Sequence, residues 1–159
     1  MRFFASCLAL LAIVGVACGA PGGPDGNPDG GGGLVDDPTK PPTLGFPTTS
    51  FVANGSTPID VTVALSRAHE FDVSVYVLHA EATLEAGQQP AAPFSDYTID
   101  GPPEVSIPAG STSATLRLLP KVPREAGPDR VFALALGSVL TQNGGLETAP
   151  GHERARIVI

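Results

Sequence analysis

Apolar residues recur at every second position in several short segments of this sequence, and no segment shows a strong helical period. The sequence IDVTVAL, from Ile59 to Leu65, places four apolar side chains on one face, and FDVSVYV, from Phe71 to Val77, has the same pattern. Further alternating segments lie at 114–118, 132–136 and 155–159. Such alternation predicts β-strands with one buried face. Several of them in a chain of 159 residues predict an all-β, antiparallel, immunoglobulin-like sandwich of about seven strands.

Proline and glycine separate these segments. Pro108-Ala109-Gly110-Ser111 predicts a compact turn, and Asn143-Gly144-Gly145 predicts a break after the preceding strand. Pro102-Pro103 is excluded from the middle of a sheet because proline has no N–H to donate. Trp is absent and the only cysteines are Cys7 and Cys18, so we expect a core of Val, Ile, Leu, Ala and Phe without a disulfide.

Residues 1–17 have the layout of a bacterial export signal. Arg2 is followed by an apolar run from Phe3 to Val16, which is shorter than the roughly 20 residues of a membrane span. Val14-Gly15-Val16-Ala17-Cys18 resembles the lipobox of a bacterial lipoprotein signal, although Gly15 stands where Leu is usual. The resemblance implies cleavage before Cys18, with lipid attached to that residue and a membrane as its partner.

Ordinary cleavage near Ala17 or Gly19 is the alternative, and it would release a soluble protein. It would also leave the thiol of Cys18 unmodified at an exposed N-terminus, where a lone cysteine is liable to oxidation outside the cytoplasm. Cysteine usage therefore favours lipidation of Cys18.

Residues 18–47 are rich in Gly, Pro, Asp and Asn, with few sizeable apolar residues. A segment of this composition cannot bury enough apolar surface to offset its ordering entropy, which predicts a disordered tether. Its Asp-Gly pairs, Asp25-Gly26 and Asp29-Gly30, match no calcium-loop spacing. We expect one folded domain to follow, from residue 48 to 159.

The stretch from Asp96 to Leu118 identifies the kind of sandwich. Asp96-Tyr97-Thr98-Ile99, followed by VSIPAGSTSATL from Val105 to Leu116, resembles a Calx-β domain. FALAL at 132–136 and ARIVI at 155–159 are similar to the late strands of that family. The resemblance covers residues 48–159 and implies an immunoglobulin-like β-sandwich.

Calx-β domains often bind calcium through acidic loops at one end, and the resemblance shows where such loops would lie. Here the acidic run after the Thr-rich strand is replaced by Lys121-Val122-Pro123-Arg124. Only Glu125 and Asp129 remain as candidate calcium ligands, with Arg124 and Arg130 close in sequence. Because calcium requires six to eight oxygen ligands, we expect calcium binding to be lost and no other cofactor to be present.

Other chemistry finds little support in the sequence. The formal net charge is −7 and the basic residues are scattered, which argues against a nucleic-acid partner. His69, His79 and His152 match no metal spacing, and no Gly-x-Ser-x-Gly elbow occurs. Asp96 is expected to be structural, and the hydroxyl of Tyr97 is expected to have a partner.

These observations predict a non-catalytic, lipid-anchored protein of the bacterial cell envelope, on the outer membrane or a periplasmic face, that displays one Calx-β-like binding or structural module. Its partner would be an envelope protein or a polysaccharide. One alternative is a secreted, soluble adhesion or carbohydrate-binding module. A weaker alternative is an envelope hydrolase that uses Asp96 and His79.

Overall fold

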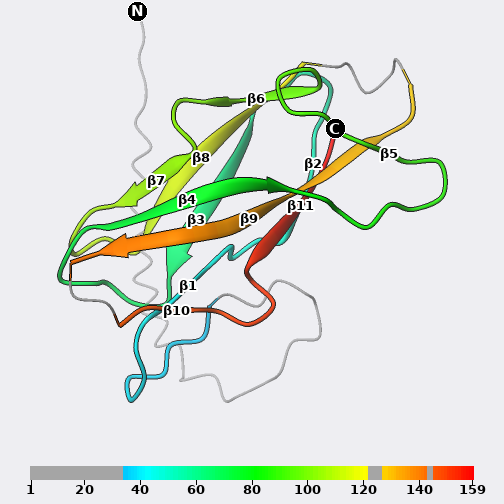
Figure 1. Cartoon of the computed structure of the whole chain (residues 1–159). Helices are drawn as coiled ribbons and strands as arrows, with labels where there is room; N and C mark the ends of the chain where they lie inside the picture. Colours follow the sequence, from blue (N-terminus) through cyan, green and yellow to red (C-terminus); the bar gives the residue numbers. More distant parts are fainter. Residues whose placement is uncertain (1–33, 122–126, 143–144) are drawn as a thin grey trace, which may run out of the picture.

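The computed structural model describes residues 34–121, 127–142 and 145–159, which form two β-sheets packed face to face (Figure 1). The five-stranded sheet has the order β10-β1-β3-β8-β6. Its strands are β1 (Thr43–Gly45), β3 (Ile59–Leu65), β6 (Tyr97–Asp100), β8 (Ser113–Pro120) and β10 (Glu147–Thr148). The six-stranded sheet has the order β2-β11-β9-β4-β7, with β5 added beside β9. Its strands are β2 (Ser50–Val52), β4 (Val73–Ala80), β5 (Gln89–Pro90), β7 (Glu104–Ile107), β9 (Arg130–Thr141) and β11 (Arg154–Val158).

The predicted all-β sandwich is confirmed. Seven of the described strands have four residues or more, and all pairings among these seven are antiparallel. The sequence did not indicate the four shorter strands, β1, β2, β5 and β10. All four take part in parallel pairs, β1 with β10, β2 with β11, and β5 with β9. No helix in the described part of the chain is long and apolar enough to cross a membrane.

The core lies between the two sheets and follows the period-two pattern. In β3, the alternate residues Ile59, Val61, Val63 and Leu65 are buried, while the residues between them are exposed or half-buried. The six-stranded sheet supplies the same kind of face, because successive side chains of a strand point to opposite sides. The largest fully buried side chains are Phe46, Phe132, Leu44, Ile107, Leu118, Leu134 and Ile157.

The predicted start of the domain at residue 48 is wrong. Strand β1 lies inside the segment expected to be a tether, and Leu44 and Phe46 are fully buried. Leu44 is opposite Leu65 in the antiparallel pair with β3, so the segment completes the core on that side. The error has a physical cause, because a few apolar residues in a polar, proline-rich segment suffice when a sheet edge offers backbone hydrogen bonds.

The longest pairing in the sandwich joins β4 to β9, and its register shifts between Val75 and Val77. Gly137 of β9 lies at this irregularity. A Cβ atom at Gly137 would lie 2.9 Å from Cδ1 of Leu78 and 3.1 Å from the carbonyl oxygen of Tyr76. A larger residue would displace the Leu78 side chain and crowd the backbone of Tyr76, so the close approach favours glycine here.

Candidate functional site

An apolar hollow of about 350 Å³ opens at one edge of the sandwich, and we call it the edge groove. Leu78 and His79 of β4 line one side, and Tyr97 and Ile99 of β6 line the other. Phe94, in the loop before β6, also borders it. The edge groove thus lies between strands of different sheets, where the core approaches the surface.

The edge groove lies where two sheet edges lack a strand neighbour. Strand β6 is the last strand of the five-stranded sheet. Strand β4 pairs with β9 from Val73 to Ala80, but β7 covers only Val73 to Tyr76 on the other side (Figure 1). No described strand covers the last part of β4 on this side.

The backbone of His79 is directed to this uncovered edge. The Val77 amide donates a hydrogen bond to the carbonyl oxygen of Pro103 at 2.7 Å, on the β7 side of β4. Alternate residues of an antiparallel strand direct their N–H and C=O groups to the same side. His79 therefore presents one donor and one acceptor beyond the end of β7, which is the arrangement that an added strand requires.

His79 and Tyr97, which line the edge groove, belong to a cluster of three stacked rings with the buried Phe132. The rings of Tyr97 and Phe132 lie parallel, with centroids 3.9 Å apart, and the ring of His79 stacks on Phe132 at 5.7 Å. Nδ1 of His79 lies 2.7 Å from the hydroxyl of Tyr97, which is the partner expected for that hydroxyl. Tyr97 is buried, and burial raises its pKa to about 12. At neutral pH the hydroxyl therefore remains protonated.

Phe94 has an unusual backbone conformation at the mouth of the groove. It is the one non-glycine residue with positive φ in the described part of the chain, at 66°, and 81% of its surface is exposed. Its amide donates to the carbonyl oxygen of Tyr97 at 2.8 Å, and its own carbonyl oxygen accepts a hydrogen bond from Nζ of Lys121. The left-handed region is sparsely populated by bulky residues, and such strain concentrates at binding sites.

Asp96 holds the loop that carries Phe94. The carboxylate is buried, and its Oδ2 accepts a hydrogen bond from the amide of Ala92 at 2.7 Å. The same oxygen lies 3.9 Å from a guanidinium nitrogen of Arg130. The carbonyl oxygen of Asp96 accepts from the amide of Lys121. These contacts orient Phe94, and they give Asp96 the structural role expected from the sequence.

Comparison with solved structures places the fold. The crystal structure of the apo-form Calx CBD1 domain superimposes with a TM-score of 0.56 at 18% sequence identity. The match covers 76% of this chain and 96% of that domain. The fold is a Calx-β-like sandwich. No family model and no curated protein matches the sequence.

The Calx-β-like fold confirms the predicted architecture, but it leaves the predicted site residues untested. Cys18 and Glu125 lie outside the described residues. Asp129 is half-buried, and its carbonyl oxygen accepts a hydrogen bond from the amide of Gln89. Among the described residues, no group of three or more His, Cys, Asp or Glu side chains is arranged to hold a metal ion.

The three histidines of the Calx-β-like domain occupy separate places. Nδ1 of His69 lies 3.2 Å from the carbonyl oxygen of Phe71, and Nδ1 of His152 lies 2.8 Å from that of Phe46. Within the described chain, no hydrogen bond joins His79 to Asp96, although both lie beside Tyr97. The pair suggested by the hydrolase alternative is therefore not assembled as a catalytic dyad.

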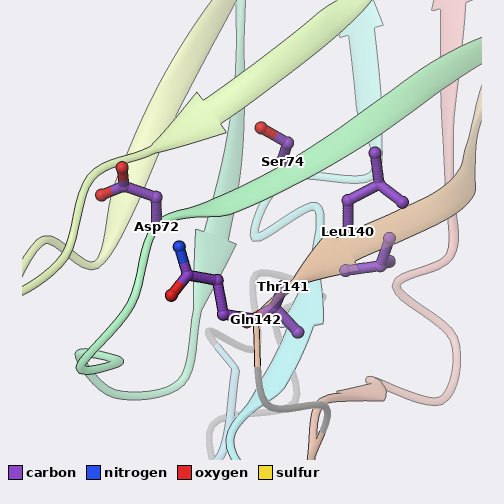
Figure 2. Close-up of a pocket in the computed structure, with 6 residues that line it drawn as sticks. Asp72, Ser74, Leu140, Thr141 and Gln142 are labelled. Carbon is purple, nitrogen blue, oxygen red and sulfur yellow. The ribbon is translucent and has the colours of Figure 1, made fainter.

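A second, more polar hollow of about 380 Å³ lies at the opposite end of β4. Figure 2 shows its lining residues, with Asp72 and Ser74 at the start of β4 and Leu140, Thr141 and Gln142 at the end of β9. Oδ1 of Asp72 already accepts a hydrogen bond from the amide of Ala109 at 2.8 Å. No aromatic side chain lines this hollow.

The sequence did not indicate the edge groove. The feature that marks the groove most clearly is the exposed ring of Phe94. In the sequence this residue is visible only as an aromatic residue in the loop Pro93-Phe94-Ser95. Leu78 is 51% exposed because it alternates with the buried Val75 and Val77 and lies on the solvent-facing side of β4.

Proposed function

We propose that the protein is a non-catalytic recognition module of the bacterial cell envelope that binds an extended segment of a partner protein in the edge groove. The observation that carries the proposal is the uncovered edge of β4 at His79, beside the exposed side chains of Leu78 and Phe94. A strand at the edge of a sheet is a template for pairing with another chain.

Addition of a strand to a sheet edge is a common mode of peptide recognition. The backbone hydrogen bonds supply affinity, and hollows for alternate side chains supply specificity. Here the N–H and C=O groups of His79 would supply the backbone contacts. Leu78, Phe94 and Ile99 would contact apolar side chains of the bound segment.

The chemistry of the site supports binding in preference to catalysis. Nδ1 of His79 is engaged by the hydroxyl of Tyr97, and the carboxylate of Asp96 is engaged by a backbone amide. The raised pKa of Tyr97 makes its hydroxyl a poor nucleophile near neutral pH. The three side chains thus position one another and the loop.

Peptide binding can be tested with a displayed library of random peptides panned on the purified protein, followed by calorimetric titration of an enriched peptide. Leu78→Glu would place a charge on the uncovered edge, and we expect it to weaken binding about tenfold or more. Leu140→Glu is the matched control, since Leu140 has a similar exposure of 55% but lies in the polar hollow. Equal affinities of the two variants would refute the proposed location.

The anchoring part of the proposal rests on Cys18. We expect a bacterial host to incorporate radiolabelled palmitate into the wild-type protein and into Cys7→Ser, but not into Cys18→Ser. Membrane and medium fractions then separate the anchored form from the secreted alternative. Label in Cys18→Ser, or wild-type protein in the medium without label, would exclude a lipid anchor at this residue.

A further inference from the structure

A third hollow, of about 230 Å³, lies on the outer face of the six-stranded sheet, and we call it the arginine hollow. Arg154 and Arg156 of β11 form one wall. They are two residues apart in one strand, so both side chains stand on the same face. Opposite them in β9 lie Ala135 and Ala133, whose small side chains leave the space open.

The loop after β4 and a residue before β2 complete the arginine hollow. Glu81, Ala82 and Thr83 contribute from the loop, and Thr49 from the other side. The lining therefore combines two arginines and two threonines with two alanines. The only carboxylate in the lining is that of Glu81.

The two arginines differ in their partners. Arg156 donates to Oε1 of Gln88 at 2.9 Å, and it lies 3.3 Å from a carboxylate oxygen of Glu85. Among the described residues, Arg154 is the cationic side chain without a hydrogen bond or ion pair, and it is not joined to Glu81. The protein has 16 acidic and 9 basic residues, so acidic partners outnumber the basic side chains. An arginine that lines a hollow without an ion pair is therefore available for an external anion.

We propose that the arginine hollow binds an acidic sugar, whose carboxylate is held by Arg154 with support from Arg156. The planar guanidinium fork matches a carboxylate with two parallel hydrogen bonds. The hydroxyl groups of Thr49 and Thr83 are able to donate to and accept from sugar hydroxyls. Ala82 and Ala133 form an apolar surface for the ring.

This inference is independent of the edge groove, because the two hollows share no lining residue. It is tested by calorimetric titration of the purified protein with sodium glucuronate. Glucose and acetate serve as separate arms, since one lacks the carboxylate and the other lacks the ring. Oligogalacturonate distinguishes a polymer from a free acid as the source of the sugar, because a polymer site binds the oligomer more tightly than the monomer.

We expect saturable binding of glucuronate, weakened at least tenfold by Arg154→Ala and weakened less by Arg154→Lys, which keeps the charge but loses the fork. Glu81→Gln removes the competing carboxylate and should strengthen binding severalfold. Arg117→Ala is the matched control, because Arg117 is an exposed arginine of the other sheet, 3.9 Å from Asp60. Thermal melting of each variant reports whether it is folded.

Three results would overturn the proposal. The first is the absence of saturable heat with glucuronate and oligogalacturonate. The second is unchanged affinity in a folded Arg154→Ala protein. The third is acetate binding as tightly as glucuronate, which would remove the sugar from the assignment.

Discussion

Nδ1 of His79 and the hydroxyl of Tyr97 lie 2.7 Å apart and join the two sheets of the sandwich by a side-chain hydrogen bond. His79 belongs to β4 of the six-stranded sheet, and Tyr97 belongs to β6 of the five-stranded sheet. The contact lies at the base of the edge groove, where β7 no longer covers β4. Because it bridges two edges, it holds the groove at a defined width.

The buried hydroxyl of Tyr97 makes stability depend on alkaline pH. Its pKa is about 12 in the folded protein and 10 in the unfolded chain, so the folded state favours the protonated form. The resulting stability is complete below pH 10 and is lost as the pH rises through 12. By pH 11 the loss is on the order of 1 kcal/mol.

This loss can be measured by urea denaturation of the wild type and of Tyr97→Phe at pH 8 and pH 11. The unfolding free energy of the wild type should fall relative to that of the variant over this range, because the variant lacks the ionisable hydroxyl. A difference that stays constant with pH would contradict the assigned burial effect.

Phe94→Gly separates folding from recognition. Glycine adopts positive φ without the penalty of about 1–2 kcal/mol that other residues incur, so the variant should be as stable as the wild type or more stable. Loss of the exposed ring should weaken the binding of a peptide selected on the edge groove. Phe94→Ala keeps the strain and removes the ring, and a melting temperature above that of Phe94→Gly would argue against the strained conformation.

Strand β11, the last described strand, contributes buried side chains that no other strand can replace in the core. Ile157 is fully buried in β11, between β2 and β9. We expect Ile157→Ala to cost about 2–5 kcal/mol and Ile157→Val about 0.5–1.5 kcal/mol, measured by chemical denaturation. Val52→Ala is a surface control with 57% exposure and should change stability by less than about 0.5 kcal/mol. Deletion of residues 157–159 should prevent folding.

Gly45 tests whether β1 belongs to the folded domain. A Cβ atom at this position would lie 2.7 Å from Cβ of His152 and 2.8 Å from Cδ2 of Leu34. We expect Gly45→Ala to destabilise the protein by about 1–3 kcal/mol, because the chain carrying His152 must shift. Gly127→Ala is the control, since Gly127 has open space around it and no positive φ. Equal melting temperatures would place residues 43–45 outside the cooperative unit.

The sequence predicted the long strands well because their signal is local. Alternation in Ile59–Leu65 and the Pro102-Pro103 pair after β6 each constrain a few neighbouring residues. The sequence also predicted a partner for the hydroxyl of Tyr97. It could not identify His79, which is 18 residues away and belongs to the other sheet. Lipidation of Cys18 and the loss of calcium binding, with Glu125 and Asp129 as the remaining candidate ligands, stay predictions.

By itself, the sequence determined that this chain forms an all-β sandwich, since period-two burial and proline breaks act over only a few residues. Only the tertiary structure decided that β1 joins the core and that β7 leaves the last residues of β4 unpaired. It also decided that Arg154 and Arg156 line an open hollow. These features depend on which edges and faces meet across long stretches of chain. The free energy of these long-range contacts comes from packing and backbone pairing between distant segments, and no local sequence pattern encodes it.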